Sequence, residues 1–243
     1  MPSPGETDDD QAALERLRAN WDLLGAEDPH WAVLSVPGKE RGGWDPGEFF
    51  ATGRTEIDEV LRRISSLPLS LELVRALDFG CGVGRLTRAL VAHFEQVDGV
   101  DISTQMIRRA RKLHAGVPGL AFHELEGTRL PFQDGCFDFV YSRLVLQHIA
   151  TRFALEYVGE FIRVLRGGGV TVFQAPSRAL DAGRETGSQR VELESGEAWV
   201  EMHVHPRESI QATVASAGGR ILAVERDDCA GDSFESLAYL ATR

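Results

Sequence analysis

The chain has 243 residues, of which 43% are hydrophobic, and a formal net charge of −11. This length suits one α/β domain with an N-terminal extension. We expect no membrane segment, because no apolar run approaches the roughly 18 residues that a spanning helix needs. The N-terminus lacks the basic and apolar parts of a signal peptide, and the absence of a Lys/Arg-rich run argues against a nucleic-acid partner.

The cysteines are three in number and widely spaced, at Cys81, Cys136 and Cys229. An odd number of scattered cysteines is typical of free thiols in a reducing compartment. The pattern therefore predicts a cytoplasmic protein without a cysteine-based zinc site.

The N-terminal part reads as a helical cap. Residues 1–9 are polar and are expected to form a disordered tail. An apolar stripe then predicts a helix that begins around Asp10 and ends at Gly25, through Leu14, Leu17, Trp21 and Leu24. Residues 26–47 are irregular, and the tryptophans Trp21, Trp31 and Trp44 either pack this cap on the core or line an acceptor pocket.

A second helix is predicted over Thr55–Ser66, where Thr55 and Asp58 have the spacing of a capping box. The helical cap is therefore assigned to residues 10–66 and the core to residues 67–243.

The core begins with a strand–turn–helix–strand unit over Val74–Asp101. An apolar strand runs to Phe79, and three glycines at alternate positions follow it: Gly80, Gly82 and Gly84. Residues without a β-carbon let a backbone approach a ligand closely, and the next helix offers free N–H groups. Asp101 ends the second strand, where a carboxylate can accept hydrogen bonds from ribose hydroxyls. Together these features predict an adenosine-containing cofactor.

The glycine spacing decides which cofactor is expected. A dinucleotide site calls for glycine or alanine at position 85, which is Arg85, and an acid, Asp78, lies two residues before the first glycine. This pattern resembles motif I of the class I S-adenosylmethionine (SAM)-dependent methyltransferases. A glycine-rich turn without a ligand is the alternative.

A second part of the resemblance follows the third predicted strand. Methyltransferases of this type commonly place an Asp or Asn five residues before the proline of an LPF segment, and then a D-G-x-F-D run. Here Glu126 stands five before Pro131, so the longer side chain departs from the pattern, and Gly127 and Thr128 are alternative partners for an adenine ring. The resemblance covers roughly residues 50–175.

The other predicted elements complete an α/β chain. The strands are Gln96–Val100, Leu120–Leu125, Phe137–Ser142, Val170–Gln174, Arg220–Glu225 and Phe234–Ala241, and the remaining helices are Arg85–Phe94, Ser103–His114, Thr151–Leu165 and Arg207–Ala217. A polar, glycine-containing insertion, expected to be mobile, occupies about residues 176–205. Near its end His203 and His205 suggest either a two-histidine metal site or, as we favour, a lead-in to the helix that starts at Pro206.

The resemblance implies a doubly wound, Rossmann-like, seven-stranded sheet of order 3-2-1-4-5-7-6. It also implies SAM as the cofactor, with a binding set drawn from the matching positions: Arg54, Asp78, Gly80, Cys81, Gly82, Gly84, Asp101, Ile102, Met106, Glu126, Gly127, Thr128 and Ser142. Arg54 is equally well read as a solvated helix-start arginine. His148 lies just past the fourth strand and is the candidate general base, although a helix-surface histidine is the alternative. No metal is expected.

Three functions compete at this point. The first is methyl transfer to a small-molecule oxygen or nitrogen nucleophile, held near Ser142, His148 and Gln174 and covered by residues 10–50 and the insertion. The second is a SAM-binding module without catalysis. The third, weakened by Arg85, is a nicotinamide-dependent oxidoreductase.

Overall fold

The computed structural model of the chain describes residues 8–180, 186–193 and 196–243. These residues form two compact units. The first unit contains Pro4–Glu126 with Val191–Ala198, and the second contains Gly127–Arg190 with Trp199–Arg243. In the described ranges, no helix is both long enough and apolar enough to cross a bilayer.

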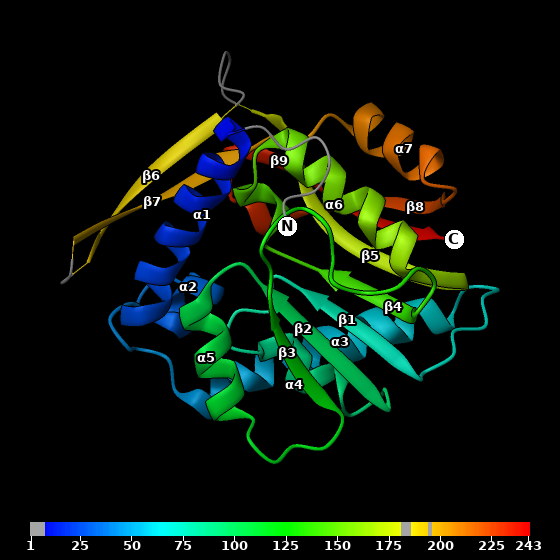
Figure 1. Cartoon of the computed structure of the whole chain (residues 1–243), viewed down its shortest axis with the longest axis horizontal. Coiled ribbons are helices and arrows are strands. Elements are labelled where there is room, and N and C mark those ends of the chain that lie inside the picture. Colours follow the sequence, from blue (N-terminus) through cyan, green and yellow to red (C-terminus); the bar gives the residue numbers. More distant parts are fainter. Residues whose placement is uncertain (1–7, 181–185, 194–195) are drawn as a thin grey trace. The chain divides into compact units, whose positions relative to one another are not determined.

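The main sheet has seven strands in the order β3-β2-β1-β4-β5-β9-β8 (Figure 1). Their bounds are β1 Arg75–Phe79, β2 Gln96–Asp101, β3 Leu120–Glu124, β4 Phe137–Ser142, β5 Leu165–Ala179, β8 Arg220–Asp227 and β9 Phe234–Thr242. Within the first unit β1, β2 and β3 run parallel, and within the second β4 and β5 run parallel while β9 is antiparallel to both β5 and β8. The order predicted from the resemblance is confirmed, since β6 and β7 belong to a separate sheet.

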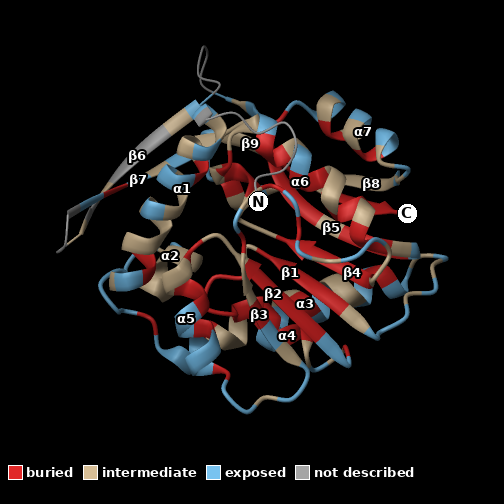
Figure 2. Ribbon diagram, in the orientation of Figure 1, coloured by how far each residue is buried: buried red, intermediate tan, exposed pale blue. Residues whose placement is uncertain are grey.

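The strands are apolar because helices cover them. All six residues of β4 are buried, and β1 and β2 are buried over most of their length (Figure 2). Such near-continuous burial is typical of parallel strands enclosed on both faces.

The first unit contains five helices in its described part. They are α1 Asp8–Glu27, α2 Pro29–Val33, α3 Pro46–Ser65, α4 Arg85–Leu90 and α5 Thr104–Leu113. Helix α1 passes through Gly25, so the predicted stop at that residue is wrong. A β-carbon on Gly25 would lie 3.1 Å from Cγ of Met106, so this glycine allows close packing and does not cap the helix.

The predicted start of the second helix at Thr55 is also wrong. Helix α3 begins nine residues earlier, at Pro46, where Asp45 is the N-cap and its carboxylate accepts a hydrogen bond from the Glu48 N–H. Proline at the first helical position and an acid at the third complete this helix start. Thr55 lies inside the helix, where its hydroxyl donates to the Ala51 carbonyl. The capping box of Thr55 and Asp58 therefore does not form.

The second unit contains helices α6 Thr151–Val164 and α7 Arg207–Ser216 and the short helical turns η1 Leu146–His148 and η2 Asp228–Ala230. The insertion at about residues 176–205 was expected to be mobile, but its described part forms strands. Strand β5 continues to Ala179, and β6 Thr186–Leu193 and β7 Gly196–His203 form a two-stranded sheet. Residues 181–185 and 194–195 of the insertion lie outside the described residues.

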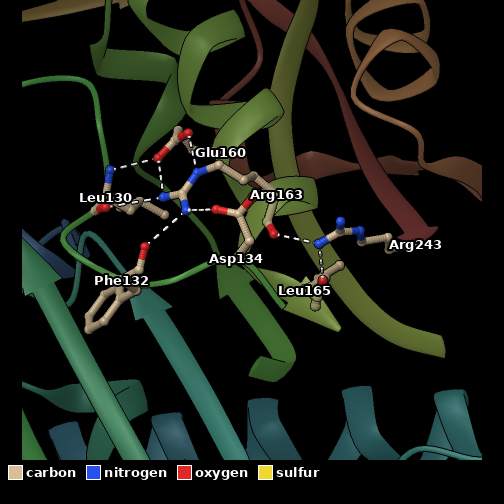
Figure 3. Close-up of polar contacts among 7 residues, drawn as sticks. All are labelled: Leu130, Phe132, Asp134, Glu160, Arg163, Leu165 and Arg243. Atoms are coloured by element: carbon tan, nitrogen blue, oxygen red, sulfur yellow. Dashed lines mark hydrogen bonds and ion pairs between the residues drawn. The ribbon is translucent and has the colours of Figure 1, made fainter. Parts of the chain in front are cut away.

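Arg163 at the end of α6 fixes the loop before β4 (Figure 3). Its guanidinium donates to both carboxylate oxygens of Glu160 at 2.6 Å, to the Phe132 carbonyl at 2.9 Å and to the Asp134 carboxylate at 2.6 Å. The Glu160 carboxylate also accepts from the Leu130 N–H. These bonds raise the pKa of Arg163, so the side chain is held as a cation. A planar fork with five donors suits this arrangement, which one lysine ammonium cannot reproduce.

Arg163→Ala is expected to lower the free energy of unfolding by about 3 kcal/mol, because it removes the guanidinium donors of the Asp134 carboxylate and of the Phe132 and Leu130 carbonyls and leaves Glu160 with the Leu130 N–H. Arg163→Lys should recover only part of this loss. Urea unfolding at neutral pH measures both effects, with Arg220→Ala on the exposed start of β8 as a control expected to change little. Equal stability of Arg163→Ala and the control would contradict the structural role of the guanidinium.

Candidate functional site

The glycine loop between β1 and α4 has a backbone that few residues other than glycine adopt. Gly80, Gly82 and Gly84 have φ values of 73°, 52° and 86°, all in the left-handed region. The N–H groups of Gly80 and Cys81 donate to the Val100 carbonyl at 2.8 and 2.9 Å, which holds the loop against β2. The side chain of Cys81 points into the interior and is buried, and burial raises the pKa of its thiol. The spacing of the glycines is therefore a requirement of the loop conformation.

Asp101 at the end of β2 holds the same loop. Its Oδ2 accepts from the Gly82 N–H at 2.8 Å, and its Oδ1 accepts from the Ser103 N–H at 2.8 Å. Burial raises the pKa of this carboxyl group to about 6, against the lowering effect of the two backbone donors. A carboxylate has about four lone-pair sites. Two backbone bonds therefore leave acceptor capacity for the hydroxyl groups of a ligand.

Asp78 is the second acid of the loop region. It is 1% exposed, and its Oδ2 accepts from the Thr87 hydroxyl at 2.6 Å. Its Oδ1 is buried with no hydrogen-bond partner among the described residues. Burial raises the pKa of Asp78 to about 7. A buried oxygen without a partner is costly, and such atoms point to a missing polar group.

Helix α2 covers part of the loop. A β-carbon on Gly82 would lie only 2.3 Å from Cγ2 of Val33. Val33 and Trp31 pack against a buried cluster of Trp44, Phe49, Val83 and Met106. The indole of Trp44 donates to the Leu34 carbonyl at 3.0 Å, while its ring packs with Val83 and Met106 of the core. This agrees with the alternative in which the tryptophans pack the N-terminal segment on the core.

The candidate Arg54 and the neighbouring Arg85 have contrasting environments. Arg54 lies on α3 with an exposed side chain. Arg85, which opens α4, is buried, and its Nη1 donates to Glu56 at 2.9 Å and to Thr52 at 3.3 Å. This ion pair could not be predicted from the sequence, because Glu56 lies 29 residues from Arg85 and no local motif links the two residues.

The other predicted cofactor-binding residues of the first unit follow Asp101 and β3. Ser103 caps α5, as predicted, and its hydroxyl accepts from the Met106 N–H. Ile102 is half-buried, Met106 is buried, and Glu126 is exposed. The structure thus brings together the glycine loop, Asp78, Asp101, Ile102 and Met106 in one unit.

The remaining predicted residues belong to the second unit. The carbonyl of Gly127 accepts from the Tyr157 hydroxyl at 3.1 Å, and Thr128 is buried. Ser142 ends β4, and its buried hydroxyl has no hydrogen-bond partner among the described residues.

His148 belongs to a chain of polar side chains. Its Nδ1–H donates to the Glu201 carbonyl at 2.7 Å, and the Gln147 amide donates to its Nε2 at 3.1 Å. The Gln174 amide donates to Gln147 at 3.2 Å and to the Ser236 hydroxyl at 2.6 Å. Burial lowers the pKa of His148 to about 4. The imidazole is therefore neutral near pH 7, with a defined tautomer.

The backbone beside this chain is strained. Leu144 has a φ of 62°, and its N–H donates to the Gln174 Oε1 at 3.1 Å. A bulky residue in the left-handed region is uncommon and is often found at functional sites. Sequence reasoning does not find Leu144, because a leucine gives no signal for this conformation.

His203 and His205 do not form the metal site that the sequence suggests as an alternative. The Nε2 of His203 pairs with the Glu201 carboxylate, while the Nε2 of His205 donates to the Leu146 carbonyl at 2.9 Å. Within the described ranges no group of three or more histidine, cysteine, aspartate or glutamate side chains could hold a metal ion.

Comparisons with known proteins agree with this geometry. Residues 77–173, which include the glycine loop, Asp101 and β4, match a family model described as a methyltransferase domain. A malonyl-[acyl-carrier protein] O-methyltransferase of Pectobacterium atrosepticum is 35% identical over 58% of this chain and 52% of its own length. A 2-methyl-6-phytyl-1,4-hydroquinone methyltransferase of Synechocystis is 33% identical over 40% of this chain and 30% of its own length. The chain thus spans about half or less of these curated relatives.

Solved structures share the fold. A magnesium protoporphyrin IX methyltransferase of Synechocystis, with bound S-adenosylhomocysteine (SAH), has a TM-score of 0.64 and 18% identity, over 95% of this chain and 99% of the other. A SAM-dependent methyltransferase of Clostridium acetobutylicum has a TM-score of 0.61 and 19% identity, over 86% of this chain and 97% of the other.

The sheet order, with the glycine loop that follows β1 and the acid at the end of β2, defines a Rossmann-like α/β fold. More narrowly, residues 77–173 are similar to a methyltransferase domain, and one of the solved structures that share the fold holds bound SAH. The resemblance stated from the sequence is confirmed.

Proposed function

We propose that the chain transfers a methyl group from SAM to a small-molecule acceptor with an oxygen or nitrogen nucleophile. The observation that carries this proposal is the left-handed glycine loop fastened to the half-buried carboxylate of Asp101. The donor set fits SAM, because Asp101 has acceptor capacity for ribose hydroxyls and the partnerless oxygen of Asp78 suits a cationic or hydrogen-bonding group. The two curated relatives described above bear the names of methyltransferases that act on a carrier-bound malonyl group and on a hydroquinone.

When bound, SAM supplies a methyl group that its sulfonium has already activated. The acceptor would provide the lone pair for this methyl group, and the sulfonium sulfur would be the leaving group. The residues of the chain position the two reactants and exclude water, which is the main requirement of such a displacement. We assign cofactor binding to the glycine loop, Asp78, Asp101 and the other predicted positions from Arg54 to Ser142.

The first test separates this proposal from its alternatives. We expect SAM to raise the melting temperature and NAD to leave it unchanged. We also expect SAH to accumulate when the protein is incubated with SAM and a panel of small hydroxyl and amine acceptors. Stabilisation by NAD instead of SAM would support an oxidoreductase. Tight SAM binding without SAH formation on any acceptor would support a non-catalytic SAM-binding module.

Asp101→Ala is expected to weaken SAM binding by more than about tenfold, since hydrogen bonds to a charged group contribute about 1.5–3 kcal/mol each. Titration calorimetry with SAH measures the effect, and circular dichroism checks that the variant is folded. Glu124→Ala, at the end of the neighbouring strand β3, is the control. Unchanged affinity in a folded Asp101→Ala variant would remove Asp101 from the site.

We propose His148 as the general base for a hydroxyl acceptor. Its low pKa keeps it neutral through the physiological range, and the Glu201 carbonyl fixes the proton on Nδ1. Its Nε2 is therefore the basic atom once the acceptor hydroxyl replaces the Gln147 amide as its hydrogen-bond donor. His148→Asn should lower kcat by about 10²- to 10⁴-fold, as loss of a general base does, with unchanged SAM affinity. His203→Asn, whose imidazole pairs with the Glu201 carboxylate, is the control. Equal kcat in both variants would show that transfer needs no base at His148.

A further inference from the structure

Asp22 lies in the middle of α1 and is not among the residues expected to bind the cofactor. Its Oδ1 accepts hydrogen bonds from the Ser103 hydroxyl at 2.7 Å and from the Gln105 N–H at 3.0 Å. Ser103 is the N-cap of α5, and Gln105 lies in its first turn. A side chain 81 residues away in the sequence therefore supplies part of the cap of α5.

Ser103 links Asp22 to the acid at the end of β2. Its backbone N–H donates to Oδ1 of Asp101 at 2.8 Å while its hydroxyl donates to Asp22. The other oxygen of Asp101 accepts from Gly82 in the glycine loop. One continuous set of hydrogen bonds thus runs from α1 through Ser103 and Asp101 to Gly82, and all of it lies in the first unit.

We propose that Asp22 is a positioning residue for the cofactor's ribose, acting through Ser103 on the carboxylate of Asp101. This inference rests on the proposed assignment of Asp101 to the ribose. Asp22 itself need not touch the cofactor. Its hydrogen bonds hold the Ser103 N–H toward Asp101, and its negative charge lies close enough to Asp101 to change how readily that group ionises.

The charges around Asp101 predict a measurable consequence. Burial is the largest cause of its raised pKa, and Asp22 on α1 raises it further, while the N–H groups of Ser103, Gly82 and Ile102 lower it. The thiol of Cys81 also faces Asp101 and is buried and neutral. An ionised Asp101 accepts ribose hydroxyls better than a protonated one. Cofactor affinity should therefore fall as the pH drops through about 6.

Two substitutions separate the hydrogen bonds of Asp22 from its charge. Asp22→Asn keeps an oxygen that accepts from Ser103 and Gln105 but removes the charge, so the pKa of Asp101 falls. The pH at which affinity is half-lost should then move below that of the unmodified protein, with affinity at pH 7.5 changed by less than about twofold. Asp22→Ala removes the bonds as well, and affinity at pH 7.5 should fall by about fivefold or more.

Titration calorimetry with SAH from pH 5 to pH 8 on the full chain provides the test, with Glu15→Ala on the exposed face of α1 as the matched control. A downward shift for Asp22→Asn with unchanged behaviour of Glu15→Ala supports the proposal. If Asp101→Ala weakens binding but Asp22→Asn leaves the pH midpoint unchanged, the role of Asp22 is overturned while Asp101 keeps its assignment. If Asp101→Ala has no effect, the ribose assignment fails, and the role of Asp22 fails with it. Asp22→Asn retains the helix cap, so the test does not depend on whether Asp22→Ala folds.

Discussion

Gly82→Val is expected to abolish SAM binding while the protein stays folded. Gly82 has a φ of 52°, which a β-branched residue adopts only with strain. The loop is also where the cofactor is expected to approach the backbone. The structure adds a further reason, because a β-carbon at this position would lie 2.3 Å from Cγ2 of Val33. A valine would therefore displace either the loop or α2. Calorimetry with SAH and circular dichroism measure the two parts of the prediction.

Controls separate backbone strain from the contact with α2. Gly116 has a φ of 80° and no atom within 4 Å of its would-be β-carbon, so Gly116→Val carries the strain alone and should keep SAM binding. Gly82→Ala with Val33→Ala removes the clashing atom, since Cβ of Val33 would stand 3.6 Å away. If the double variant binds SAH, the loss of binding caused by a side chain at position 82 is due to its clash with Cγ2 of Val33. A Gly82→Val variant that binds SAH tightly would show that the loop does not approach the ligand.

The parts of the fold that the sequence predicts correctly are those with local causes. The glycine loop is recognisable because its left-handed backbone needs glycine at Gly80, Gly82 and Gly84. The start of α5 is recognisable because Ser103 caps it through the Met106 N–H, three residues ahead. The buried strand β4 is recognisable because its apolar run is continuous. In each case the residues that determine the structure lie within a few positions of one another.

The start of α3 shows how tertiary packing can determine a helix that the local sequence does not predict. Asp45 and Pro46 carry a helix-start signal, but Gly47 and Gly53 weaken the helical pattern between them and Thr55. A β-carbon on Gly53 would lie 2.5 Å from the Arg85 carbonyl, so this glycine is required by the close approach of α3 to α4. Only the partner helix, distant in sequence, explains why a glycine lies inside this one.

The contacts that sequence reasoning misses at the candidate site are all long-range. Asp22 reaches Ser103, Arg18 donates to the Leu125 carbonyl at 2.8 Å, and Arg85 pairs with Glu56. The first two come from α1, which the sequence presents only as an amphipathic helix. No periodicity identifies their partners, because the pairing depends on where α1 lies on the first unit.

These contacts change the expected result of removing residues 1–50. The sequence-based expectation is a core that still binds SAM but does not transfer the methyl group, because these residues read as a separable cap. In the structure, Leu14 and Leu24 of α1 and Trp44 and Phe49 beyond it are buried. The deletion also removes Asp45, the N-cap of α3. Residues 8–50 are thus part of the first unit's core.

We therefore expect the truncated chain to lose SAM binding together with the cooperative unfolding of the first unit. The expected loss of stability can be judged from single substitutions. Leu24→Ala should lower the free energy of unfolding by about 2–5 kcal/mol, while Glu15→Ala on the exposed face should change it little. Loss of four large buried side chains at about 2–5 kcal/mol each is comparable to the 5–15 kcal/mol by which typical domains are stable. Thermal unfolding and calorimetry with SAH test this on the truncated and full-length chains. A truncated chain that unfolds cooperatively and binds SAH with full affinity would instead support the interpretation that residues 1–50 form a cap separable from the core.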